Sequence, residues 1–228
     1  TPEIEAGVIT ALKRPTACGV SVGHYLVPAG TLGCLAKRDD GKPDEIYILS
    51  NNHVLANTNN AERGDPILEP GLTDGGNPAH PIAHLTEFVP LRFDGSANRV
   101  DLAIARLARA AEVSPRIAGI GLVRNPPMAP CLGQAVRKRG RTTLETAGEI
   151  VDLSADIEVR YGLRTAFFED QLAINDGTVP FSAAGDSGAL ILDAAESRPV
   201  GLLFAGGGTT TFANPIDLAL EKLKIRIC

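Results

Sequence analysis

Short runs of apolar residues separated by turn-forming residues make up most of the chain after residue 16. Such runs, bounded by Gly, Pro, Asn and Asp, are typical of β-strands. The segments 39–43 and 73–78 are strong turn signals of this kind. In the first half, strands are predicted at 18–25, 31–37, 45–51, 66–69, 81–89 and 100–107. In the second half, strands are predicted at 134–139, 145–153, 157–161, 166–175, 188–192, 199–205 and 210–213.

The two ends of the chain have a different pattern. Over 1–13, apolar residues at every fourth position share one helical face, and Pro2 suits the first turn of a helix. Near the other end, Asn214 can cap a helix that has Pro215 at its first position. We therefore predict short N- and C-terminal helices.

A proline-rich stretch, predicted as a loop, separates the two sets of strands. Because no long amphipathic helix lies between successive strands, the pattern favours two antiparallel β-barrels over a βαβ sheet. The sequence thus predicts an all-β fold with two six-stranded antiparallel barrels. The predicted parts are an extension at 1–16, a first barrel at 17–113, a linker at 114–131, and a second barrel with the C-terminal helix at 132–228.

Composition and charge exclude several classes of function. The 228 residues are 44% hydrophobic and 21% charged, with a net charge of −5, which is ordinary for a globular protein. The densest basic cluster, 137–139 with Arg141, is short, and we interpret it as the solvated face of a strand. No basic stripe suits nucleic acid, and no apolar run approaches the ~20 residues of a membrane span. We expect neither nucleic acid nor a membrane as a partner.

Three residues could together form a nucleophilic site. Ser187 lies in Gly-Asp-Ser-Gly, His53 follows an apolar run, and Asp101 opens another. A serine hydroxyl needs a base to accept its proton, and the base needs a carboxylate to orient it. Each residue alone has an ordinary interpretation as a turn serine, a strand-end histidine or an edge charge. Their occurrence in the order His, Asp, Ser, each in a suitable context, predicts a catalytic triad.

These motifs give the chain a resemblance to the trypsin/chymotrypsin-like serine peptidases over nearly its whole length. Within them it resembles most the bacterial trypsin-like peptidases related to the plant narrow-leaf-type proteins. The resemblance implies two six-stranded barrels, hydrolysis of peptide bonds, and an oxyanion hole formed by the N–H groups of Gly185 and Ser187. The segments that carry it are 23–25, 29–33, 49–57, 140–143, 181–182, 185–188 and 201–206.

The resemblance also implies a specificity pocket. Its base would be Phe181, and its wall would be Phe204, Ala205 and Gly206. None of these residues is acidic, so a preference for Arg or Lys substrates is not supported and an apolar or small side chain is expected. Core packing is an equal alternative for Phe181 and Phe204.

The chain departs from the digestive relatives at two places. They have a serine at the Phe204 position that donates to the triad Asp, so Asp101 is expected to use backbone donors at Asn52 and His53. They also use a newly cut N-terminus to pair with the Asp before the serine. No such cleavage sequence is evident, so Asp186 must have another partner or activity must be switched in another way.

The positions of the four cysteines predict the cellular compartment of the protein. Secreted relatives usually have a cysteine just after the catalytic His, where this chain has Val54. With no visible signal peptide, this predicts reduced thiols and a cytoplasmic location. A pairing of Cys18 with Cys34 across neighbouring strands remains open.

The sequence therefore predicts a serine endopeptidase acting on proteins or peptides, with no metal and no cofactor. The histidines of the segment 80–84 are interpreted as surface residues, because strand or loop geometry would not make their rings converge. The missing activation signal leaves room for an activating or associated protein or a ligand. It also motivates the alternative of a catalytically dormant, protease-like binding or scaffold module. An esterase or acyltransferase would share the same chemistry.

Overall fold

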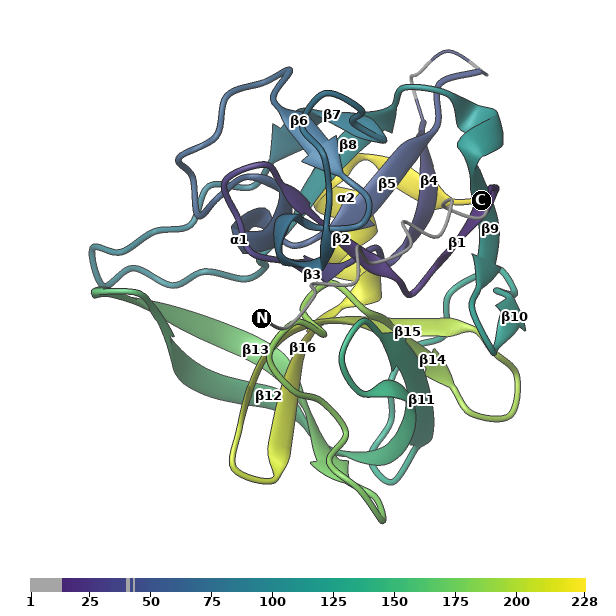
Figure 1. Ribbon diagram of the computed structural model, residues 1–228. Coiled ribbons are helices and arrows are strands. Elements are labelled where there is room, and N and C mark those ends of the chain that lie inside the picture. Colours follow the sequence, from purple (N-terminus) through teal and green to yellow (C-terminus); the bar gives the residue numbers. More distant parts are fainter. Residues whose placement is uncertain (1–13, 40–41, 43) are drawn as a thin grey trace, which may run out of the picture.

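Strands are the main regular elements of the computed structural model, which describes residues 14–39, 42 and 44–228 (Figure 1). The helix predicted over 1–13 lies outside the described residues. Each of the six runs predicted in the first half coincides with a strand, and the all-β class is confirmed. The first-half strands are β1 (Thr16–Cys18), β2 (Ser21–His24), β3 (Gly30–Thr31), β4 (Cys34–Arg38), β5 (Tyr47–Ser50), β6 (Pro66–Leu68), β7 (Ala83–Phe88) and β8 (Ala103–Leu107).

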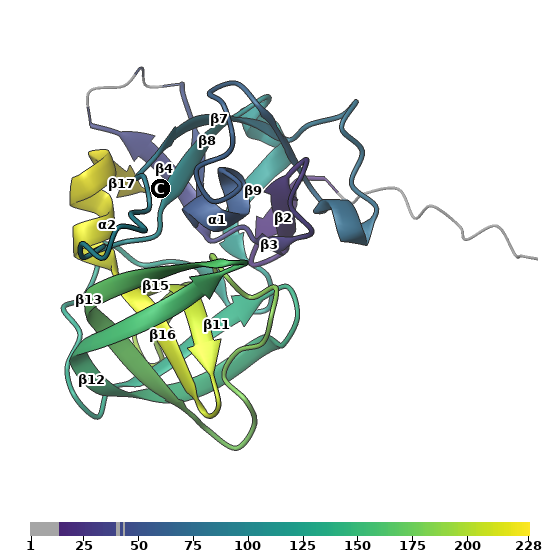
Figure 2. The same cartoon turned by 90° about the vertical axis from the view of Figure 1, so that its left-hand side faces the viewer.

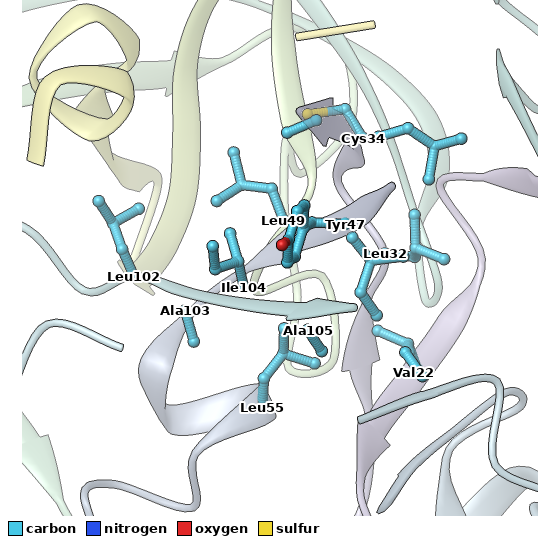
Figure 3. Close-up of a cluster of buried hydrophobic side chains, with 14 of the residues drawn as sticks. Val22, Leu32, Cys34, Tyr47, Leu49, Leu55, Leu102, Ala103, Ile104 and Ala105 are labelled. Atoms are coloured by element: carbon cyan, nitrogen blue, oxygen red, sulfur yellow. The ribbon is translucent and has the colours of Figure 1, made fainter. Parts of the chain in front are cut away.

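Seven of these strands belong to one eight-stranded sheet in the order β17-β4-β5-β8-β7-β6-β2-β3. The edge strand β17 (Ile225–Ile227) comes from the other end of the chain and pairs antiparallel with β4. The centre of the sheet is apolar because β5 and β8 pair Leu49 with Ile104 and bury both side chains. Figure 3 shows these two side chains in the core cluster with Val22, Leu32 and Leu55.

The proline-rich connection is more regular than its sequence suggests. It contains β9 (Val113–Ile117) and β10 (Gly121–Leu122), which pair with each other. β9 also pairs in parallel with β1, so the start of the described chain is tied to this connection. A loop was predicted here because the prolines mask two strands that are short and lie in a small three-stranded sheet.

Six second-half strands close into a barrel in the order β11-β12-β13-β16-β15-β14. The runs predicted at 145–153 and 157–161 form one strand, β12, in which irregularities of register interrupt the pairing with β13 without ending it. The barrel strands are β11 (Ala135–Gly140), β12 (Leu144–Tyr161), β13 (Arg164–Asp176), β14 (Leu190–Asp193), β15 (Pro199–Gly207) and β16 (Thr210–Pro215).

The part of the chain that the structure describes has two α-helices, α1 (Asn52–Leu55) and α2 (Ile216–Leu223). α2 follows the last barrel strand, and its buried residues Ile216, Ala219 and Leu223 belong to the core cluster of the first-half sheet. Figure 2 shows the helix beside β17 and β4. The expected cap role of Asn214 is wrong, because Pro215 is the N-cap and no side-chain cap bond forms. The Asn214 side chain instead accepts the backbone N–H of Asp101 at 3.0 Å and donates to Gln171 at 2.7 Å.

None of the four cysteines forms a disulfide: Cys18 and Cys34 are buried, and Cys131 and Cys228 are exposed. Across the described segments, no helix has the length and apolar character needed to cross a bilayer.

Candidate active site

Neighbouring strands bring His53 and Asp101 together. His53 lies in α1, just after β5, and Asp101 lies just before β8. Because β5 and β8 pair side by side, with Ser50 opposite Ala103, the segments that carry the two residues meet at one sheet end. His53 Nδ1 is 2.6 Å from Asp101 Oδ2, and the His53 backbone N–H donates to Oδ1 at 3.2 Å.

The direction of the hydrogen bond in this pair leaves His53 able to act as a base. The Asp101 side chain is fully buried, whereas the His53 side chain is 21% exposed. An ionised carboxylate only accepts hydrogen bonds, so His53 Nδ1 carries the proton and Nε2 is left basic. The ring can therefore accept a proton on the side facing away from Asp101.

A third donor to Asp101 was missed by the sequence reasoning. The expected backbone donor at His53 is present, but Asn52 directs its side-chain amide to Asn59 and Val89. The hydroxyl of Tyr161 donates to Asp101 Oδ2 at 2.7 Å. Burial raises the pKa of Tyr161 well above its usual value, and the Asp101 charge and hydrogen bond raise it further, so the phenol stays a donor.

Ser187 shares a cavity with His53. The cavity has a volume of about 670 Å³, and the loop before β14 brings Ser187 to it. Ser187 Oγ makes a long hydrogen bond of 3.5 Å to the carbonyl oxygen of Phe204. In the part of the chain that the structure describes, no hydrogen bond joins Ser187 to His53. Catalytic hydrogen bonds of this kind often shorten only when substrate binds.

The partner of Asp186 is a buried lysine, Lys138. Asp186 is fully buried, and its Oδ2 is 3.3 Å from Lys138 Nζ. The carboxylate also accepts the Thr143 hydroxyl at 2.6 Å and the N–H groups of Thr142 at 2.8 Å and Ala183 at 3.0 Å. Burial alone would raise the pKa of Asp186, but these hydrogen bonds and the Lys138 charge lower it.

The interpretation of the basic cluster as a solvated strand face is wrong for Lys138. Its side chain is fully buried inside the barrel and also donates to Thr143 and to the carbonyl oxygen of Leu144. Side chains alternate along a strand, so Lys138 shares the inward face of β11 with the buried Val136. Burial lowers the pKa of Lys138, and the charge of Asp186 opposes that shift.

The two backbone N–H groups expected at the oxyanion hole lie on the same loop. Among the described residues, neither the Gly185 nor the Ser187 N–H donates a hydrogen bond to the protein. Thr31 donates its hydroxyl to the Gly185 carbonyl oxygen at 2.9 Å, and Thr142 donates to that of Ala184 at 2.7 Å. Gly185 has a φ of +99°, a conformation that glycine adopts without strain.

The residues expected to form a specificity pocket lie in two places. Phe204, Ala205 and Gly206 line the cavity beside Ser187. Phe181 is fully buried in the barrel core and does not line the cavity. The hydroxyls of Ser182 and Thr211, 2.6 Å apart, line the cavity near Gly206 instead. The end of β12 also lines it and adds two charged residues, Glu158 and Arg160.

Comparison with solved structures shows a shared fold. The chain is similar to a glutamic acid-specific serine protease that uses a histidine triad in substrate binding, with 17% identity, a TM-score of 0.65, and coverage of 93% of this chain and 100% of the other. It is also similar to Thermobifida fusca protease A, with 17% identity, a TM-score of 0.63, and coverage of 93% and 98%. For the Cellulomonas bogoriensis chymotrypsin the values are 17%, 0.62, 93% and 98%. The expected chymotrypsin-like double-barrel class is thereby confirmed.

Sequence comparison adds the family. No curated protein matches this chain significantly. The family model of the Nal1 C-terminal domain matches residues 96–217, a segment that contains Asp101, Tyr161 and Ser187. Since this match spans more than half of the chain, the protein belongs to the Nal1 C-terminal domain family and has the fold of the chymotrypsin-like serine proteases.

Proposed function

We propose that this protein is a serine endopeptidase in which Ser187, His53 and Asp101 hydrolyse peptide bonds of protein or peptide substrates. The observation that carries the proposal is the 2.6 Å contact between the buried Asp101 carboxylate and His53, which lines the same cavity as Ser187. A carboxylate behind an imidazole beside a serine is the arrangement that activates a hydroxyl.

The proposed reaction has two stages. His53 Nε2 takes the Ser187 proton as Oγ attacks the substrate carbonyl, and Asp101 stabilises the imidazolium that forms. His53 then gives this proton to the leaving amine, which breaks the peptide bond and leaves an ester on Ser187. Water, deprotonated by His53, attacks the ester, and His53 returns that proton to Ser187 Oγ as the acid is released. Before attack, the Ser187 hydroxyl must rotate from the Phe204 carbonyl oxygen toward His53.

In this proposal the N–H groups of Gly185 and Ser187 stabilise the negative oxygen of the tetrahedral intermediates. Neither N–H group has an acceptor among the described residues, and Thr31 and Thr142 hold the same loop by hydrogen bonds; both observations support that role. The Lys138–Asp186 pair holds the loop without a newly cut N-terminus. Activity without N-terminal processing follows from the proposal.

The cavity supports a preference for small side chains before the scissile bond. Gly206 packs closely against Ser182, because a Cβ on it would lie 3.0 Å from Ser182 Oγ. The paired Ser182 and Thr211 hydroxyls make that wall polar but uncharged. A small apolar or hydroxylated side chain suits such a wall better than a long cationic one.

Labelling and cleavage test the proposal. A fluorophosphonate that modifies activated serines should label the wild-type protein, and Ser187→Ala should abolish labelling while leaving the circular dichroism spectrum unchanged. Profiling with a peptide library should show cleavage that is lost in the same variant. Ser154→Ala, which removes an exposed hydroxyl on β12, is the matched control and should retain labelling.

The possible results separate the alternatives. Undiminished labelling of Ser187→Ala would refute the assigned nucleophile. A wild-type protein that neither labels nor cleaves would favour the dormant binding or scaffold module. Turnover of ester substrates without cleavage of any peptide would favour an esterase.

A further inference from the structure

Two groups donate to one carboxylate oxygen at the candidate site. Asp101 Oδ2 accepts from His53 Nδ1 at 2.6 Å and from the Tyr161 hydroxyl at 2.7 Å. Asp101 is fully buried, so the ionised carboxylate depends on protein donors for its stability. At the position of Phe204 the digestive relatives have a serine that donates to the triad Asp, but a phenylalanine side chain has no hydrogen-bond donor. Among the described residues, Tyr161 and His53 are therefore the two whose side chains donate to the Asp101 carboxylate.

Tyr161 reaches Asp101 from the other half of the molecule. It is the last residue of β12, at the tip of the long hairpin formed by β12 and β13, whereas Asp101 lies just before β8 of the first-half sheet. Figure 1 shows this hairpin extending from the barrel. The Tyr161 ring meets the His53 ring edge-on, with centroids 5.7 Å apart, and the Phe93 ring in the same way at 5.9 Å. These contacts fix the direction of the phenol as well as its position.

A second side chain holds the hairpin tip in place. The Arg164 guanidinium lies 4.0 Å from the Phe93 ring centroid and donates to the carbonyl oxygen of Thr58 at 3.2 Å. Phe93 and Thr58 both belong to first-half loops, so Arg164 attaches the tip of the hairpin to the half that carries Asp101. Arg164 comes three residues after Tyr161, on the opposite side of the hairpin turn.

We propose that Tyr161 is a positioning residue for the Asp101–His53 pair, and that Arg164 acts through it by docking the hairpin tip. This inference rests on the proposed peptidase function. Tyr161 fixes the orientation of the Asp101 carboxylate and shares its negative charge, so that His53 keeps its Nδ1–H directed at Oδ2. Without the phenol, the buried carboxylate keeps only the two donors of His53.

The charged groups around the Tyr161 hydroxyl determine how its removal changes the hydrogen bond between His53 and Asp101. The charged or titratable side chains around the phenol are His53 and Asp101, with Arg164 across Phe93 and with Glu158 and Arg160 on the cavity wall. A carboxylate that loses a hydrogen-bond donor attracts the imidazolium more strongly. Removing the hydroxyl should therefore strengthen the hydrogen bond from His53 Nδ1 to Asp101 Oδ2.

Tyr161→Phe tests the proposal because it keeps the ring and removes only the hydroxyl. We expect kcat to fall roughly 10- to 100-fold, the range of a hydrogen bond to a charged group, with KM nearly unchanged. The matched control is Tyr47→Phe, which removes a hydroxyl that donates to Glu45 at 2.8 Å away from the cavity, and it should retain full activity. Thermal unfolding of both variants checks that each is folded.

A double-mutant cycle tests the part assigned to Arg164. Arg164→Ala should lower kcat in the wild-type background but have almost no further effect in Tyr161→Phe, because the hydroxyl that it positions is then absent. Fully additive losses would show that Arg164 acts independently of Tyr161 and would overturn that part of the proposal.

A spectroscopic readout separates this inference from the proposed function. The proton between His53 Nδ1 and Asp101 Oδ2 should give a low-field ¹H resonance in the wild type, and Tyr161→Phe should move it further downfield. This shift is expected even if the protein cleaves no substrate, in which case only the peptidase proposal fails. An unchanged resonance, or an unchanged kcat in an active protein, would overturn the positioning role of Tyr161.

Discussion

The ion pair between Lys138 and Asp186 connects the barrel interior with the loop that carries Ser187. Both side chains are fully buried. Two isolated charges in such a place would cost several kcal/mol each, so each depends on the other and on the hydroxyl of Thr143. Because Asp186 directly precedes Ser187, its anchoring also holds the backbone from which the proposed oxyanion donors extend.

Replacing Lys138 should therefore damage both stability and the site. Lys138→Met keeps much of the volume but leaves the Asp186 carboxylate buried without its counter-ion. We expect the free energy of unfolding in urea to fall by about 3–5 kcal/mol. Labelling of Ser187 by fluorophosphonate should slow in the fraction that remains folded.

The neighbouring Arg137 provides the control. It is partly exposed and lies 3.6 Å from Glu145, so Arg137→Met should cost about 1 kcal/mol or less. Equal losses for the two variants would contradict the special role assigned to Lys138.

The sequence identifies some of these residues better than others. Gly-Asp-Ser-Gly and the order of His53 and Asp101 are local signals, and they were enough to find Ser187 and His53, which line one cavity, and Asp101, which bonds to His53. The burial of Lys138 could also be predicted from the sequence, because the apolar Val136 lies two positions earlier on the same strand face. The role of Tyr161 could not be predicted from the sequence, because its contact with Asp101 depends on the length and docking of a hairpin.

At the scale of elements, the hairpin of β12 and β13 links the two halves. Asn98, in a first-half loop, is its main polar attachment point. The Asn98 side chain donates to the carbonyl oxygens of Arg92 and Phe167, and its backbone N–H also bonds to Phe167. In return, Glu169 donates its backbone N–H to Asn98.

Asn98→Ala should loosen this attachment. It leaves buried backbone groups without their side-chain partners, and we expect a loss of about 1–3 kcal/mol in unfolding free energy. Hydrogen exchange should accelerate at the hairpin tip, around 157–168, more than in β14. Asn60→Ala removes an exposed side chain that bonds only within its own turn, and it should change neither quantity. Exchange that is unchanged at the tip would show that the hairpin does not depend on Asn98.

The hairpin also shows why its strands were only partly predicted. Pattern alone divided β12 at 154–156, where Ser154, Ala155 and Asp156 interrupt the apolar alternation. The structure continues the strand through this point with irregular pairing to β13. Such a bulge changes the register of one pair of strands, and a single sequence carries no information about its partner strand.

At the scale of the whole molecule, carboxylates with lowered pKa values occur in both halves. Among them are Asp65, Asp74, Asp186 and Asp193. For Asp65 and Asp186, burial opposes the shift but hydrogen bonds and positive charges exceed it. For Asp74 and Asp193, hydrogen bonds from Arg141 and Gln134 are the largest cause. All four carboxylates are therefore more stable as anions in the folded protein than in the unfolded chain.

This predicts a loss of stability in acid. Below the ordinary Asp pKa of 3.8, the unfolded chain binds protons that the folded protein still excludes. The free energy of unfolding should be near its full value at pH 6 and should decline as the pH falls through about 4 toward 3. Urea titrations at a series of pH values measure this. A stability that stays constant or rises between pH 5 and pH 3 would contradict it.

The pairing of β17 with β4 has a consequence for biosynthesis. β17 leaves the ribosome after every strand of the barrel, yet it forms the edge of the sheet that carries His53 and Asp101. That sheet cannot be completed while the barrel is still being translated. The first half must therefore wait as a nascent intermediate with one unpaired edge, and its maturation is coupled in time to the synthesis of the half that supplies Ser187.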